Sequence, residues 1–150
     1  MELRVYEHSD NSYPMDKILC LEKYTKEDLN NLIKCIRSVT QGNIIELSHQ
    51  DFIKKNECEL FLYVCETDEG IVHIKDNLYE CHLSIKTYLD MIDLIKAVII
   101  SSSKDGFQWL YNLNVSIEFL LSHKGVDSTL KCNHPYRRYA LALPESFCMG

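Results

Sequence analysis

Two segments of the chain repeat apolar residues at the three- and four-residue spacing of an amphipathic helix. The first opens at Thr25, a good N-cap residue, carries acidic residues in its first turn, and closes at Gly42. Its apolar stripe consists of Leu29, Leu32, Ile33, Ile36 and Val39. The second segment begins near Ser84 or Thr87 and stops in the polar stretch 101–106. Both segments are therefore predicted to be helices with one buried face.

Elsewhere the apolar period changes from 3.6 to 2, which indicates β-strands. A first short strand is predicted around Leu3 and Val5, followed by a run of turn formers at residues 9–16. Further strand candidates are the segments 44–47, 60–65, 71–75, 79–85, 107–111, 115–121 and 139–143.

Two turn signals connect the three strands in the middle of the chain. Asp68-Glu69-Gly70 is typical of a hairpin, and Asp76-Asn77 predicts a second tight turn. The three strands are therefore predicted to form an antiparallel meander. The whole order is strand, helix, meander, helix, strands, and the sequence shows no internal repeat. This order favours a single α+β domain spanning residues 1–150, with an antiparallel sheet that has a central meander and two helices packed on one face.

Composition and charge narrow the possible functions. The 150 residues are 46% hydrophobic and carry 22 acids against 16 bases, a net charge of −6 that argues against a general phosphate-backbone binder. No apolar run approaches the ~20 residues that span a bilayer, and the first residues lack the features of a signal peptide. We therefore expect a cytoplasmic protein with no membrane partner and no direct nucleic-acid partner.

No catalytic motif is present, and the seven cysteines are expected to be reduced. Cys35, Cys65 and Cys81 have apolar neighbours and are predicted to fill the core. Neighbouring residues on a strand point to opposite faces, so Cys81 and the adjacent histidine are not expected to form a nucleophilic pair. The pair Cys132 and His134 has no second ligand pair nearby. The sequence therefore predicts no catalytic residue, no metal and no cofactor.

The acidic excess is concentrated in one segment. Nine acids and three bases lie between Glu46 and Glu80, so this segment has the net charge of the whole chain. Solvated hairpin tips are often acidic, but such a localised field also suits a basic protein partner. The residues predicted to bind that partner are Glu57, Glu59, Glu66, Asp68, Glu69, Asp76 and Glu80.

A small acidic α+β domain without catalytic motifs resembles the immunity proteins that neutralise bacterial polymorphic or contact-dependent toxins. Segments 106–111 and 117–122 are similar to a strand pair in this class. The resemblance implies a non-enzymatic protein that binds a toxin domain, often a nuclease, and blocks its active site directly or from beside. It assigns a role to no individual residue.

Three questions stay open at this point. One alternative function is a small hydrolase whose Cys/His or carboxylate site is assembled only in the fold. Another is an adaptor that adds a strand through its sheet edge. Trp109, the single tryptophan, is either a core residue or an exposed anchor for a partner.

Overall fold

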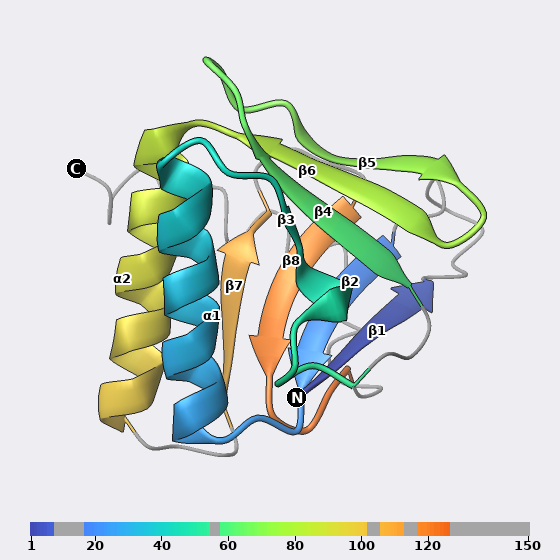
Figure 1. Cartoon of the computed structure of the whole chain (residues 1–150). Helices are drawn as coiled ribbons and strands as arrows, with labels where there is room; N and C mark the ends of the chain where they lie inside the picture. Colours follow the sequence, from blue (N-terminus) through green and yellow to red (C-terminus); the bar gives the residue numbers. More distant parts are fainter. Residues whose placement is uncertain (8–16, 55–57, 102–105, 113–116, 127–150) are drawn as a thin grey trace.

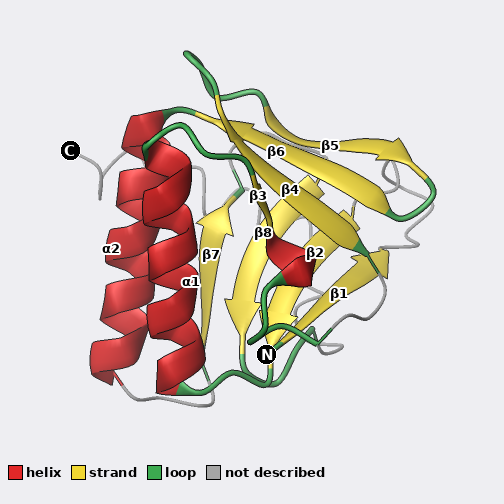
Figure 2. Cartoon of the chain, viewed as in Figure 1, coloured by secondary structure: helices red, strands yellow, loops and turns green. Residues whose placement is uncertain are grey.

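The computed structural model describes residues 1–7, 17–54, 58–101, 106–112 and 117–126. In this part of the chain, two helices lie side by side next to two four-stranded sheets (Figures 1 and 2). Its elements, in chain order, are β1 (Glu2–Glu7), β2 (Lys17–Glu22), α1 (Lys26–Thr40), β3 (Ile45–Glu46), the 3₁₀ turn η1 (Leu47–His49), β4 (Glu59–Val64), β5 (Gly70–Lys75), β6 (Leu78–Leu83), α2 (Ile85–Ser101), β7 (Phe107–Tyr111) and β8 (Ile117–Ser122). Neither described helix has the length and apolar character needed to cross a membrane.

Both sheets are mixed. The first sheet has the order β1-β2-β8-β7 and the second has the order β3-β4-β6-β5. In each, the two central strands are parallel and each edge strand is antiparallel to its neighbour. The predicted α+β class is confirmed, whereas the single antiparallel sheet is wrong.

The predicted meander is wrong in one pairing. The turn at Asp76-Asn77 does join the antiparallel strands β5 and β6, but β4 pairs with β6 in parallel and not with β5. Burial explains the choice: β4 and β6 both present alternating buried residues to the core, whereas four of the six residues of β5 are exposed. The two strands with an apolar inner face take the centre, and β5 takes the edge.

The strand β2 has no counterpart among the predicted strands. Its residues 18–21 are all apolar and all buried, so they show no period-2 alternation. Continuous apolar runs are typical of strands covered on both faces, and here β2 lies at the centre of the first sheet between β1 and β8. Trp109 on β7 is also buried, in a small cluster with Ile18 and Leu120 on the outer face of this sheet.

The predicted helices are confirmed. Thr25 caps α1, because its side chain accepts the Asp28 N–H while the Asp28 carboxylate accepts the Thr25 N–H. The five predicted stripe residues of α1 are all buried in the main core. The facing stripe of α2 consists of Tyr88, Met91, Ile92 and Ile95. This core also takes in side chains from the inner faces of both sheets.

The topology repeats along the chain. The segments β1-β2-α1-β3-β4 and β5-β6-α2-β7-β8 have the same order of antiparallel pair, helix and antiparallel pair. Each segment gives its first pair to one sheet and its second pair to the other, and the two helices run antiparallel (Figure 1). The spacing from Thr25 to Leu29 recurs from Ser84 to Tyr88. The repeat is therefore one of strand order, carried by different side chains.

Tyr88 holds the central strands of the second sheet together from the core side. Its hydroxyl donates to the carbonyl of Tyr63 on β4 at 2.8 Å and lies 3.2 Å from the carbonyl of Cys81 on β6. The side chain is fully buried. Burial, followed by the neighbouring Cys81 thiol, raises the pKa of Tyr88 far above its ordinary value. The phenol therefore stays protonated and remains a donor.

We expect Tyr88→Phe to lower the free energy of unfolding by about 1–2 kcal/mol, because a buried carbonyl loses its donor. The pKa of Tyr88 in the folded state lies above the ordinary value of 10.0. Its contribution to the free energy of unfolding is therefore fully present below pH 10 and is lost progressively as the pH rises above 10. The alkaline fall in stability should therefore be shallower in Tyr88→Phe. Urea denaturation at pH 7 and above pH 10 measures both effects. Tyr79→Phe, whose hydroxyl accepts a part-buried hydrogen bond from the Lys17 amine at 3.3 Å, should change stability less; equal losses would contradict the role given to Tyr88.

Candidate functional site on the outer face of the second sheet

The outer face of the second sheet mixes acids with aromatic rings. Residues of β4 and β6 alternate between the buried inner face and this half-buried outer face. The outer residues of the two strands are Glu59, Phe61, Tyr63, Leu78, Glu80 and His82. In the strand register Phe61 lies opposite Glu80 and Tyr63 lies opposite His82. Rings and carboxylates therefore sit side by side across the parallel pair.

A chain of polar contacts runs across this face. The sulfur of Cys65 lies 3.3 Å from Nδ1 of His82, and Nε2 of the same ring lies 2.9 Å from Oε1 of Glu80. The ring of Tyr63 stacks on the imidazole with centroids 4.7 Å apart and an interplanar angle of 7°. The thiol, imidazole and carboxylate thus form one connected group, with the ring plane held by stacking.

The connection between β4 and β5 brings Cys65 to His82. Because β4 and β6 are parallel, the chain has to pass over the carboxyl end of β6 to reach β5 on its far side. Two backbone hydrogen bonds anchor this passage to β6: Cys65 N–H donates to the Leu83 carbonyl, and Glu69 N–H donates to the His82 carbonyl, both at 2.9 Å. Gly70 then turns the chain into β5 with a φ of 90°, which favours glycine.

Asp68, in the middle of this connection, is hydrogen-bonded to the start of helix α2, where the Ser84 hydroxyl accepts the Thr87 N–H at 3.3 Å. Its Oδ1 accepts the backbone N–H of Ser84 at 2.7 Å, and its Oδ2 accepts the hydroxyl of Thr87 at 2.6 Å. Desolvation opposes ionisation, but these hydrogen bonds outweigh it and hold the pKa of Asp68 below its ordinary value. Both carboxylate oxygens of this predicted partner-binding acid therefore already accept hydrogen bonds from residues of the same chain.

The described cysteines differ in environment. Cys35 and Cys81 are buried as predicted, and burial raises the pKa of Cys81 to about 12. Cys65 was predicted to fill the core, but it is only half-buried and lies beside His82. Desolvation, followed by the negative charge of Glu69, raises the pKa of the Cys65 thiol. Cys81 and His82 lie on opposite faces of β6, as expected.

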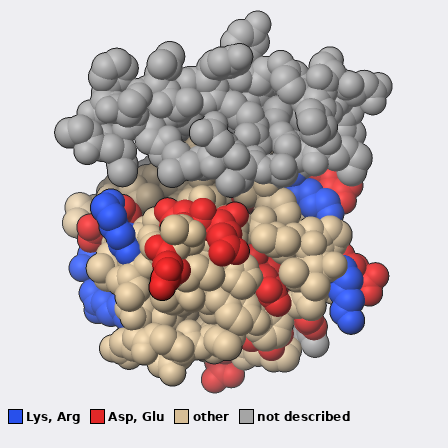
Figure 3. Space-filling model, turned by 90° about the horizontal axis from the view of Figure 1, so that it is seen from above, with Lys and Arg blue, Asp and Glu red and all other residues tan. Residues whose placement is uncertain are grey.

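The predicted acidic patch is divided between two ends of the second sheet. Glu66, Asp68 and Glu69 follow the carboxyl end of β4. Figure 3 shows acidic side chains gathered on the face seen from above. Asp76 lies at the opposite end, in the β5–β6 turn, where Glu59 N–H donates to the Asn77 carbonyl at 2.9 Å.

A six-residue strand is roughly 17–20 Å long, about twice the Debye length of ~8 Å at physiological ionic strength. The acids at the two ends therefore act as two separate fields, and Glu80 lies between them on β6. Glu57 lies outside the described residues, as do Cys132 and His134.

Cys65 and His82 are the site residues that sequence reasoning missed. They are 17 positions apart, and in the predicted meander their strands are not neighbours. The signal that could have found them is the parallel pairing of β4 with β6. Once that pairing is known, Cys65 follows β4 directly at the edge where β6 ends.

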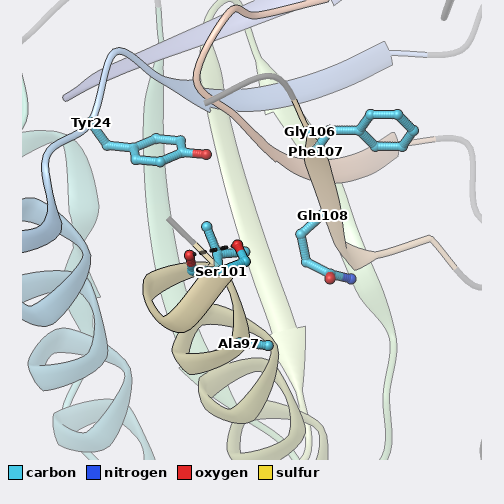
Figure 4. Close-up of a pocket in the computed structure, with 7 residues that line it drawn as sticks. Tyr24, Ala97, Ser101, Gly106, Phe107 and Gln108 are labelled. Atoms are coloured by element: carbon cyan, nitrogen blue, oxygen red, sulfur yellow. Dashed lines mark hydrogen bonds between the residues drawn. The ribbon is translucent and has the colours of Figure 1, made fainter. Parts of the chain in front are cut away.

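A second feature lies away from this face. A hollow of about 240 Å³ opens between the end of α2 and the start of β7. Tyr24 lies on one side of it, and Phe107 and Gln108 lie on the other (Figure 4). Its described lining residues carry no carboxylate, imidazole or thiol.

Comparisons with known proteins add no likeness to this picture: no family model, no curated protein and no solved structure matches the chain.

We expect Asp68→Ala to lower the free energy of unfolding by about 1 kcal/mol at pH 7, because its hydrogen bonds with Ser84 and Thr87 are lost. The pKa of Asp68 in the folded state lies below the ordinary value of 3.8. Its contribution to the free energy of unfolding is therefore fully present above pH 3.8 and is lost as the pH falls through the folded-state pKa. The difference between variant and wild type should therefore shrink in acid. Chemical denaturation at pH 7 and below pH 3.8 measures it. Glu66→Ala, an exposed acid of the same connection, should stay within about 0.5 kcal/mol; a larger loss there would contradict the assignment.

Proposed function

We propose that this protein binds and neutralises a basic protein partner in the cytoplasm, as an immunity protein inhibits its cognate toxin. The observation that carries the proposal is the outer face of the second sheet, where half-buried carboxylates flank a stack of aromatic rings. Aromatic residues are enriched at interface centres, and polar or charged residues form the rim.

The aromatic stack supplies the centre of the proposed interface. Phe61 and Tyr63 have ring centroids 6.4 Å apart, and the stack continues to the His82 imidazole at 4.7 Å. Phe61 lies between Glu46 on β3 and Glu80 on β6 in the strand register. An arginine of the partner can stack on such a ring and donate to a neighbouring carboxylate, which a lysine does less well.

The acids have different expected roles. The side chains of Glu46 and Glu80 are 17% and 27% exposed, so their pairing with the partner would be largely desolvated. Loss of such a pair acts mainly on dissociation. Glu66 and Glu69 are exposed at the end of the sheet and would act mainly on the rate of encounter. A basic toxin domain such as a nuclease has the charge that fits this face.

A thiol hydrolase is the second candidate function, favoured by the contacts of Cys65 with His82 and of His82 with Glu80. A nucleophilic cysteine requires a readily formed thiolate. Here the pKa of the thiol is raised and Glu69 adds negative charge beside it. A raised thiol pKa and a neighbouring carboxylate weaken the case for a nucleophile, whereas neither disfavours a binding face.

The binding proposal is tested by capturing the partner from cells of the source organism with the tagged chain, then measuring kinetics with the purified partner. Glu66→Lys with Glu69→Lys should slow association on the order of tenfold at low salt. Phe61→Ala should speed dissociation, with a loss of about 2 kcal/mol or more in binding free energy. Production of the captured partner without this protein should arrest growth, and co-expression should restore it.

The matched control reverses two acids elsewhere, Asp90→Lys with Asp93→Lys on α2, and should leave both rates nearly unchanged. A captured partner that is acidic, or binding that depends on the α2 acids and not on the sheet, would overturn the proposal. Turnover of a substrate that is lost in Cys65→Ser would instead establish the hydrolase.

A further inference from the structure

Three different ligand types converge at the carboxyl end of β6. The Cys65 sulfur, a His82 ring nitrogen and a Glu69 carboxylate oxygen all lie within 4.8 Å of one another. We propose that these three residues bind one divalent metal ion of the zinc class, with Glu80 orienting the imidazole. The proposal rests on contacts within this chain and does not require the function proposed above, although it shares Glu69 and Glu80 with the binding face.

The spacing of the donor atoms fits a shared metal ion. Zinc bonds of about 2.3 Å to sulfur and about 2.0 Å to nitrogen at a tetrahedral angle separate the two donors by about 3.5 Å. The Cys65 sulfur and Nδ1 of His82 are 3.3 Å apart, so an ion fits between them with a shift of a few tenths of an ångström. Nδ1 also faces the thiol, as ligation by this nitrogen requires.

Glu80 acts on the other side of the ring. Its Oε1 lies 2.9 Å from Nε2 of His82, which places the ring proton on Nε2 and leaves the Nδ1 lone pair for the metal. A carboxylate that holds the distal nitrogen of a ligating histidine is the usual outer partner in zinc sites. The Tyr63 ring stacked on the imidazole restricts its rotation further.

The connection that carries two of the ligands is held in place from several sides. Cys65 and Glu69 each donate a backbone hydrogen bond to β6, and Asp68 between them is bound to Ser84 and Thr87 at the start of α2. A site whose ligands are fixed before binding pays little ordering cost. The fold therefore fixes the backbone of the segment that carries Cys65 and Glu69 close to His82.

The donor set selects the metal. A thiolate and an imidazole favour zinc over calcium or magnesium, which prefer oxygen ligands only. On binding, the Cys65 thiol releases its proton to solvent, and the thiolate and the Glu69 carboxylate together balance the two positive charges. Three protein ligands leave a fourth position for water or for a side chain of a partner.

A second cluster is less suited to a soft metal. Glu46, His49 and Glu59 also lie within range of one another, but they include no thiol. Nδ1 of His49 is already in contact with Glu46 at 2.6 Å, on a side chain that is 54% exposed.

The test is titration of the reduced, metal-free full chain with Co²⁺ and Zn²⁺. Co²⁺ should bind with one equivalent per chain and give the visible bands of a tetrahedral ion, together with a near-ultraviolet thiolate-to-cobalt band. Zn²⁺ should displace it. Cys65→Ser and His82→Gln should abolish the thiolate band, and Glu69→Gln should weaken Zn²⁺ binding. Glu80→Gln should weaken it about 10–100-fold while keeping the band, since Glu80 only orients the ring.

Each variant has a matched control that should bind as the wild type does: Cys35→Ser, His73→Gln, Glu66→Gln and Glu59→Gln. Cys132→Ser should also leave binding unchanged. The unmodified chain provides a second measurement that does not depend on a variant folding: Zn²⁺ should slow alkylation of Cys65, identified by peptide mass mapping. No thiolate band, a band retained in Cys65→Ser, or equal alkylation of Cys65 with and without Zn²⁺ would overturn the proposal.

Discussion

The parallel pairing of β4 with β6 is the constraint on which the rest of the second sheet depends. Parallel strands end at the same edge, so the chain that leaves β4 must pass over the end of β6 before it can enter β5. That passage sets Cys65 and Glu69 around His82, and it sets Asp68 against the first turn of α2. A hairpin between β4 and β5 would have carried all three residues away from β6. The face that we assign to binding and the proposed metal ligands are both consequences of this one pairing.

The repeated topology produces a related arrangement at the end of β2, where the outcome is different. There the chain after β8 passes over the strand end: Lys23 N–H donates to the His123 carbonyl at 3.1 Å. Gly125 lies so close that an added Cβ would be 2.5 Å from Oε2 of Glu22, whose carboxylate accepts the Tyr6 hydroxyl at 2.7 Å. Glu22 is buried, whereas His82 is reachable from solvent. The end of β2 is thus covered by packed residues, whereas the end of β6 is partly exposed at His82.

How much could be predicted from the sequence depended on how local each signal is. The helices were found because caps and apolar stripes lie within a few residues of one another, as at Thr25 and Leu29. The strand β2 was missed because burial on both faces removes the alternation that marks a strand. The hairpin predicted from residues 68–70 was wrong, because β4 and β5 on either side of it do not pair with each other. The thiol–imidazole contact was out of reach for the same reason, since it depends on pairing between strands. The acids were singled out by charge alone, which does not reveal that Asp68 is hydrogen-bonded to the start of α2.

The bond between Asp68 and the start of α2 has a consequence for how this region opens. The β4–β5 connection, the end of β6 and the first turn of α2 share hydrogen bonds, so none of them can detach without breaking contacts of the other two. Such segments open as one cooperative unit. A ligand held by the connection would therefore slow amide exchange in the first turn of the helix, at backbone groups it never touches. Amide exchange at the start of α2 would therefore report whether a ligand is bound at this face.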